Sequence, residues 1–182
     1  SAYGGVMVSL GHKLGLYKAM AGAGPLDAKE LAARAGCAER YVREWLSAQA
    51  AAGYVDYHAA SATYELAPEQ ATVLADEDSP VFIPPAWNVP ASMWFDEAQS
   101  LDAFRTGRGV AWGEHDARMS CGSAAFYRNG YRASLVAQWL PALDGVVEQL
   151  RAGIDVADIG CGHGHSTVLM AQAFAASRFH GF

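Results

Sequence analysis

The first third of the chain places apolar residues at helical spacing. Residues 5–20 carry one apolar stripe that predicts a helix, and this stripe consists of Val6, Leu10, Leu14 and Tyr17. A shorter helix is expected next, because Asp27 and Glu30 have the spacing of a capping box and Gly36 is a favourable end. The pattern therefore predicts a long helix followed by a short one.

A third helix is predicted over residues 38–52, ending at Gly53. The face expected to point inward carries Val42, Trp45, Leu46 and Gln49. The opposite face carries Arg40, Arg43, Glu44 and Ser47. Residues 54–57 and 62–66 then alternate as the two strands of a β-ribbon do. Helix, short helix, helix and ribbon is the order of a winged helix-turn-helix domain.

Charge decides how far this order predicts DNA binding. A recognition helix in the major groove needs cationic side chains to meet the phosphates. Residues 1–75 hold six Lys or Arg against seven Asp or Glu, and Glu39 and Glu44 flank the two arginines of the third helix. A solvated or protein-facing helix is the favoured interpretation, and a phosphate contact is the alternative.

The middle of the chain differs in composition. Residues 81–90 contain three of the seven prolines, which argues against a regular helix and predicts a linker. Ser92 is expected to cap a helix that ends near Gly107. Four of the five tryptophans lie between residues 80 and 140, namely Trp87, Trp94, Trp112 and Trp139. They line a substrate pocket or a subunit interface, or they pack in an ordinary core.

The most informative pattern lies near the end of the chain. Two helices, residues 123–140 and 141–153, precede an apolar run that Asp158 interrupts. Glycines follow at alternate positions, Gly160, Gly162 and Gly164. A helix over residues 167–174 and a second strand at 178–182 complete the pattern of strand, glycine turn, helix and strand. Such glycines allow positive φ angles and close approach of a ligand, and the helix start offers unpaired N–H groups.

The spacing of the glycines indicates which class of ligand such a turn binds. The dinucleotide pattern G-x-G-x-x-G needs glycine at position 165, where this chain has His165. The pattern here is D-x-G-x-G-x-G, which resembles motif I of the Rossmann-like methyltransferases that use S-adenosylmethionine (SAM). The resemblance implies that the loop wraps the methionine end of SAM, and that Asp158 braces the loop and the ligand's ammonium group. A plain strand-to-helix connection is the alternative.

Residues before this motif extend the resemblance. W-L-P-A-L-x-G-V at 139–146, followed by V-A-D-I-G-C-G-H-G, is similar to a SAM methyltransferase subfamily with an N-terminal winged helix, sometimes labelled transcriptional regulators. In related enzymes the helix before motif I supplies a side chain that covers the bound SAM. The resemblance implies that Tyr127 or Tyr131 has this role here, and packing in the core is the alternative. The candidate SAM-binding residues are Tyr127, Tyr131, Asp158, Gly160, Cys161, Gly162 and Gly164. His115 and Asp116 are expected to form a surface pair in a loop, with orientation of an acceptor as the alternative, and no catalytic base is assigned.

Composition narrows the class of protein and its expected cellular location. A net charge of −6 argues against a protein that coats nucleic acid or anionic membrane. No apolar run reaches the ~20 residues of a membrane span, and the start lacks a signal-peptide pattern, so a cytoplasmic location is expected. Cys37, Cys121 and Cys161 are widely spaced, which indicates neither disulfides nor a zinc knuckle. His163 and His165 lack further ligands at suitable spacing, so no metal site is expected.

These observations predict a mixed fold in three parts. Residues 1–78 are expected to form the winged helix-turn-helix domain, mostly helical with a β-ribbon and used for dimerisation. Residues 79–122 are expected to form a linker and a helical region on the substrate side. Residues 123–182 are expected to begin a Rossmann-like α/β methyltransferase domain, which the chain leaves incomplete because further strands of that fold would follow Phe182.

The expected function is SAM-dependent methyl transfer to a small-molecule acceptor by a homodimer, with this chain inactive by itself. One alternative is a transcriptional regulator that binds DNA and responds to SAM or a related metabolite. Another is a non-catalytic dimerisation protein with a vestigial SAM fold. The balanced charge of the winged helix favours the enzyme over the regulator, and the intact glycine loop argues against the vestigial protein.

Overall fold

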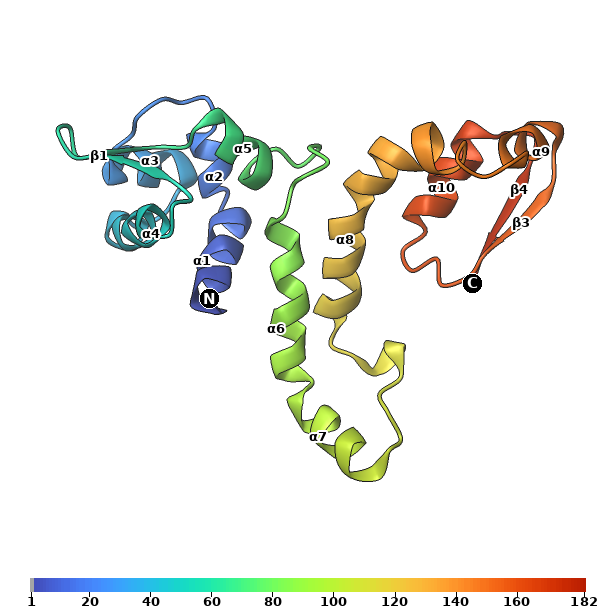
Figure 1. Ribbon diagram of the computed structural model, residues 1–182. Coiled ribbons are helices and arrows are strands. Elements are labelled where there is room, and N and C mark those ends of the chain that lie inside the picture. Colours follow the sequence, from blue (N-terminus) through green and yellow to red (C-terminus); the bar gives the residue numbers. More distant parts are fainter. Residues whose placement is uncertain (1) are drawn as a thin grey trace. The chain divides into compact units, whose positions relative to one another are not determined.

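The computed structural model describes residues 2–182, which form two compact units, the first ending at Trp87 and the second beginning at Asn88. The elements of the first unit are α1 (Ala2–Lys13), α2 (Leu16–Met20), α3 (Ala28–Ala35), α4 (Glu39–Ala51), β1 (Asp56–His58), β2 (Thr63–Glu65), α5 (Pro68–Leu74) and the 3₁₀-helix η1 (Pro84–Trp87) (Figure 1). Those of the second unit are α6 (Asn88–Phe95), α7 (Glu97–Thr106), the 3₁₀-helix η2 (Trp112–Glu114), α8 (Ala117–Ser134), the π-helix η3 (Leu135–Trp139), α9 (Val146–Ala152), β3 (Asp155–Asp158), α10 (His165–Ala173) and β4 (Arg178–Gly181). The three-part division at residues 78 and 122 stays a prediction.

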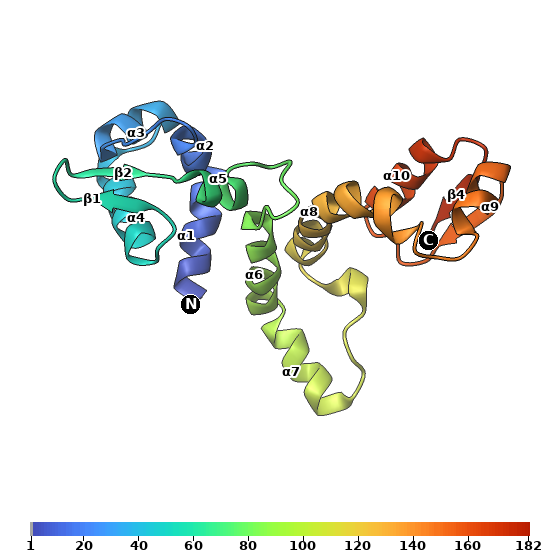
Figure 2. The same ribbon diagram turned by 45° about the horizontal axis from the view of Figure 1, so that its top comes forward.

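The second and third predicted helices of the first unit are present as α3 and α4, and the predicted ribbon follows them as β1 and β2. The capping box before α3 is confirmed, because the Glu30 amide donates to Asp27 Oδ1 over 2.8 Å and the Asp27 amide donates to Glu30 Oε2 over 2.9 Å. On α4 all the side chains expected to face inward are buried, namely Val42, Trp45, Leu46 and Gln49. The Tyr17 hydroxyl donates to the Gln49 side-chain oxygen within this core, and burial raises the pKa of Tyr17. β1 and β2 pair antiparallel and lie side by side (Figure 2).

The prediction of one helix over residues 5–20 was wrong. Leu14 and Gly15 separate α1 from α2, and Gly15 has a φ of 69°, a left-handed conformation that ends a helix. The break changes the helical phase, so Val8 and Tyr17 point into the core. The rest of the predicted stripe is solvent-exposed instead, with Val6 and Leu10 on α1 at 58% and 44% exposure and Leu14, just after α1, at 48%.

The prediction of a linker over residues 81–90 was wrong from Asn88 onward. α6 begins there, and Pro90 lies in its first turn, where no intrahelical N–H bond is needed. Ser92 is not a helix cap, because it is fully buried within α6 and its hydroxyl donates to the Val89 carbonyl over 2.7 Å. α6 lies beside α8 in both ribbon views (Figures 1 and 2).

The end of the second unit has the predicted order of strand, turn, helix and strand. β3 and β4 pair in parallel, with Val156 opposite Phe179. Their apolar side chains pack on a small core from the surrounding helices, which contains Leu135, Leu140, Leu150, Met170 and Phe174. α9 begins at Val146 rather than at Pro141, because residues 140–145 form turns. The mixed fold class is therefore confirmed. Among residues 2–182, no helix has both the length and the apolar composition required to cross a membrane.

Candidate ligand site at the glycine loop

The loop after β3 is held in a conformation that only glycine adopts readily. Gly160, Gly162 and Gly164 have φ angles of 76°, 55° and 75°. A Cβ atom built at any of the three meets no protein atom within 4 Å. Backbone conformation, and not crowding within the chain, therefore favours glycine at these positions, and the open side of the loop leaves room for close approach of a ligand.

Asp158 fixes both ends of this loop. Its carboxylate accepts hydrogen bonds from the Ser166 hydroxyl over 2.9 Å and the Thr167 hydroxyl over 2.6 Å, in the first turn of α10. Its carbonyl accepts from the Phe182 amide, and the Phe182 carbonyl accepts from the amides of Gly160 and Cys161. The end of β3, the loop and the start of α10 are thereby tied together.

A cavity of about 490 Å³ lies between this loop and α8. Its wall consists of Trp112, Ser120, Ser123, Ala124, Tyr127, Tyr131, Gly160, Cys161, Gly162, His163, His165 and Phe182. The structure thus brings Tyr127 and Tyr131 to the same cavity as Gly160, Cys161 and Gly162. Asp158 and Gly164 are not part of the wall and act from behind it, on the conformation of the loop.

The tyrosines form an aromatic wall on α8. Their rings stack with centroids 6.1 Å apart and an interplanar angle of 28°, and Trp139 packs edge-on against Tyr131 at 5.9 Å. Ser120 and Ser123 share this face of α8 because they precede Tyr127 at helical spacing. Neither serine was among the predicted site residues, although the helical spacing to Tyr127 is visible in the sequence. Nothing in the sequence placed Trp112 or Phe182 beside the glycine loop.

His163 of the loop and His165, the first residue of α10, also belong to the wall. The rings of His163 and His165 lie 6.4 Å apart at an angle of 23°. Burial, followed by the nearby charges of Arg128 and His163, lowers the pKa of His165. Burial thus favours the neutral form of the His165 ring.

Comparison with known proteins identifies the first unit. Residues 2–76 match the family model described as the Rv2258c-like winged HTH domain. The chain carries a winged helix-turn-helix domain of this kind. No curated protein sequence matches the chain.

Solved structures of methyltransferases have a similar fold. PigF with SAH gives a TM-score of 0.64 at 18% identity, covering 96% of this chain and 53% of that one. An O-methyltransferase family protein from Burkholderia thailandensis gives 0.63 at 15% identity, covering 97% and 52%. Human N-acetylserotonin methyltransferase in complex with SAM gives 0.57 at 17% identity, covering 98% and 55%. At such identities the likeness shows the fold, and the chain spans about half the length of these proteins.

The outer face of α4 in the winged-helix domain carries paired charges. Arg40 forms an ion pair with Glu44, and Arg43 forms one with Glu39, each one helical turn apart. All of these side chains are solvent-exposed. Each arginine therefore has a carboxylate beside it, which lowers the net positive charge that α4 presents to a polyanion.

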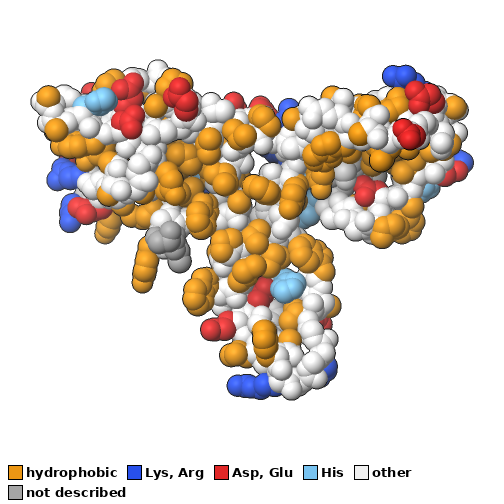
Figure 3. All heavy atoms as spheres, viewed as in Figure 1, with side chains coloured by type: hydrophobic (Ala, Val, Ile, Leu, Met, Phe, Trp, Pro, Cys, Tyr) orange, Lys and Arg blue, Asp and Glu red, His pale blue; other side chains and the backbone are white. Residues whose placement is uncertain are grey.

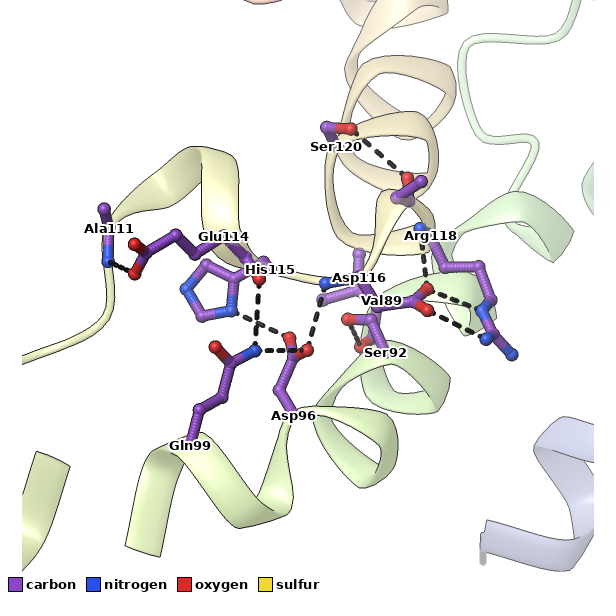
Figure 4. A network of polar contacts seen from close by, with 11 residues as sticks. Val89, Ser92, Asp96, Gln99, Ala111, Glu114, His115, Asp116, Arg118 and Ser120 are labelled. Atoms are coloured by element: carbon purple, nitrogen blue, oxygen red, sulfur yellow. Dashed lines mark hydrogen bonds and ion pairs between the residues drawn. The ribbon is translucent and has the colours of Figure 1, made fainter. Parts of the chain in front are cut away.

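The prediction of a surface pair at His115 and Asp116 was wrong. Both belong to a polar network around Asp96, which is 4% exposed (Figure 4). The Asp96 carboxylate contacts His115 Nδ1 over 2.8 Å and accepts hydrogen bonds from the Asp116 amide over 3.0 Å and the Gln99 side chain over 2.8 Å. Asp116 in turn caps α8 and pairs with Arg118 at 2.6 Å. Burial works to raise the pKa of Asp96, but the hydrogen bonds from His115, Asp116 and Gln99 outweigh it and lower the pKa overall.

Proposed function

We propose that this chain provides the winged-helix domain and part of the cofactor site of a SAM-dependent methyltransferase that acts on a small-molecule acceptor. The observation that carries the proposal is the cavity where Tyr127 and Tyr131 face Gly160, Cys161 and Gly162. It lies beyond the carboxyl end of β3, where ligands bind in open α/β folds.

The residues of this site fit SAM in size and chemistry. The cavity of about 490 Å³ lies within the range of roughly 300–1,000 Å³ typical of small-molecule sites. In the proposal, Gly160, Gly162 and Gly164 allow the ligand to approach the backbone, and Cys161 contributes main-chain groups. Asp158 holds the loop in place. Tyr127 and Tyr131 cover the ligand, and aromatic faces attract a sulfonium cation.

The chemistry requires positioning and exclusion of water. When bound, SAM would supply an activated methyl group, and its transfer to an acceptor atom would break the S–C bond and leave S-adenosylhomocysteine (SAH) and a proton. The aromatic wall of Trp112, Tyr127 and Tyr131 lowers the local dielectric and fixes the ligand's orientation. We assign no catalytic base among the described residues.

The solved relatives support this choice of cofactor, because PigF was solved with SAH and human N-acetylserotonin methyltransferase with SAM. The name of the human enzyme, an N-acetylserotonin methyltransferase, also supports a small-molecule acceptor. The remaining parts of the proposal are a cytoplasmic location and a homodimer formed through the winged-helix domain. Exposed apolar side chains on α1 support the homodimer, namely Tyr3, Val6 and Leu10. Nucleic acid is a disfavoured partner because the arginines of α4 are paired.

Isothermal titration calorimetry of the full chain with SAM and with SAH tests the proposal. We expect heat of binding with both, and a loss of about tenfold or more in SAH affinity for Asp158→Asn, because a neutral amide holds Ser166 and Thr167 less strongly than a carboxylate. Asp155→Asn is the matched control, because Asp155 lies on the same strand, is exposed and pairs with Arg178 at 2.8 Å. Absence of heat with both ligands would refute the proposed function.

A further inference from the structure

The outer face of α7 has no covering element within the second unit. No residue of α7 is buried, and both of its large apolar side chains are exposed, Leu101 to 50% and Phe104 to 93%. The half-buried positions of the helix are Gln99, Ser100 and Ala103, which lie on its opposite side. α7 therefore packs on its own unit through polar and small side chains and presents its apolar ones to solvent.

The exposed stripe of α7 is complementary to itself when its direction is reversed. Glu97, Ala98, Phe104 and Arg105 each lie three or four positions from Leu101, so all five share one face of the helix. In an antiparallel pair of α7 helices centred on Leu101, Glu97 of one copy faces Arg105 of the other. Phe104 faces the small Ala98, which leaves room for its ring, and the two Leu101 side chains meet at the centre.

The charges of this stripe are available for a contact between copies. Among residues 2–182, the side chains of Glu97 and Arg105 form no ion pair and no hydrogen bond, whereas Asp102 and Arg108 already pair with each other at 2.8 Å. An isologous contact requires complementary residues at equal distances from its centre, and a contact with a different protein imposes no such relation. The pattern therefore favours a second copy of this chain as the partner.

We propose that α7 is a self-association surface, on which a second copy of this chain binds antiparallel with Leu101 at the two-fold axis. The inference rests on the homodimer of the proposed function and adds a second contact to it. α7 offers ten residues, fewer than the roughly 20–30 residues per partner of a standard interface, so it supplements other contacts such as the one proposed for α1. Burial of Leu101 and Phe104 favours association, and the two Glu97–Arg105 pairs fix the register.

Charge reversal tests this pairing through the dissociation constant of the full chain, measured by sedimentation equilibrium at low ionic strength. Glu97→Arg turns both symmetry-related pairs into Arg against Arg, and Arg105→Glu turns both into Glu against Glu. We expect the dissociation constant to rise about fivefold or more in each variant. The double variant Glu97→Arg with Arg105→Glu restores both pairs, so its constant should lie within about twofold of that of the unaltered chain.

A mixture of the two single variants tests the antiparallel arrangement. Each mixed dimer has two arginines on the stripe of one copy and two glutamates on the stripe of the other, so every pair across the contact is opposite in charge. The mixture should therefore associate about as tightly as the unaltered chain, although each variant alone does not. Glu148→Arg and Arg151→Glu are the matched controls, because both residues are exposed on α9 and the substitutions change the net charge equally. Alone or mixed, they should leave the constant unchanged.

Two results would overturn the inference while the proposed cofactor site, which calorimetry with SAM tests, stands. In the first, the single reversals leave self-association unchanged, and a different partner then covers this face. In the second, neither the double variant nor the mixture rescues the weakened association, so the contact is not antiparallel about Leu101. An unaltered chain that stays monomeric overturns the inference together with the proposed homodimer.

Discussion

Gly11 lies where α1 crosses the aromatic pair of Trp45 and Tyr17, whose rings meet edge-on at 5.0 Å. Trp45 is fixed there because its Nε1 donates to the Met7 carbonyl over 2.8 Å. A Cβ atom at Gly11 would overlap the indole and lie 2.7 Å from Tyr17 Cε2. We therefore expect Gly11→Ala to destabilise the winged-helix domain by about 1–3 kcal/mol in equilibrium urea unfolding, because a packed ring has no room to move.

At Gly130 the same substitution should have the opposite effect on stability. It lies within α8, and a Cβ atom there meets no atom within 4 Å. Gly130→Ala should stabilise the second unit by about 0.5–1 kcal/mol, because alanine loses less backbone entropy in a helix. Equal shifts of the same sign in the two variants would show that the packing at Gly11 is not as described.

At the scale of elements, Asp96 joins α6 and α7 to the start of α8 through the network of Figure 4. Asp96→Ala removes the acceptor for three donors, of which the Asp116 amide lies at the start of a helix. We expect the thermal midpoint of the second unit to fall by about 5 °C or more. Asp102→Ala is the control, because Asp102 is an exposed residue of α7 paired with Arg108 at 2.8 Å, and it should leave the midpoint nearly unchanged.

The same network makes the stability of the second unit depend on pH in the acid range. The pKa of Asp96 is lower in the folded chain than its ordinary value of 3.8. Its stabilising contribution is therefore present above that ordinary value and is lost as the pH falls through the lower folded pKa. Thermal midpoints recorded between pH 7 and pH 3 should converge for Asp96→Ala and the unaltered chain only at the acid end. Convergence near pH 6 would contradict this assignment.

At the scale of the whole molecule, apolar side chains remain on the surface of both units. On the face shown in Figure 3 they extend over the lobe of α6 and α7. Trp94 of α6 and Phe104 of α7 are among the exposed apolar side chains. Our proposal of a homodimer concerns the exposed stripe on α1 and is tested by sedimentation velocity. Leu10→Asp should weaken self-association about tenfold or more, because a buried unpaired carboxylate is costly.

Leu143→Asp serves as the control for that test, because Leu143 is similarly exposed and lies in the other unit. It should leave the association unchanged. An unaltered chain that sediments as a monomer, or a Leu10→Asp variant that still forms dimers, would exclude the α1 face as the interface.

Features that depend on neighbours along the chain were predictable. The capping box of Asp27 and Glu30 and the buried face of α4 are set by spacings of three and four residues. The turn that begins at Gly160 follows from glycines at alternate positions, because φ is a property of each residue. Features that depend on packing were not predictable from the sequence. The spacing of the apolar residues did not indicate that Gly15 would end α1 and change the helical phase of α2 relative to it. Ser92 is buried because α8 covers α6.

The sequence by itself determined α3, α4 and the ribbon, and the order of strand, glycine loop, helix and strand around Asp158 to Gly164, because short-range hydrogen bonds and backbone sterics act within a few residues. Only the tertiary structure decided which side chains share the cavity. The aromatic face of α8 lies more than thirty residues before the imidazoles of the loop, and no spacing rule connects them. Similarly, His115 reaches Asp96 across nineteen positions. Such long-range contacts result from helix packing, to which residues throughout the unit contribute.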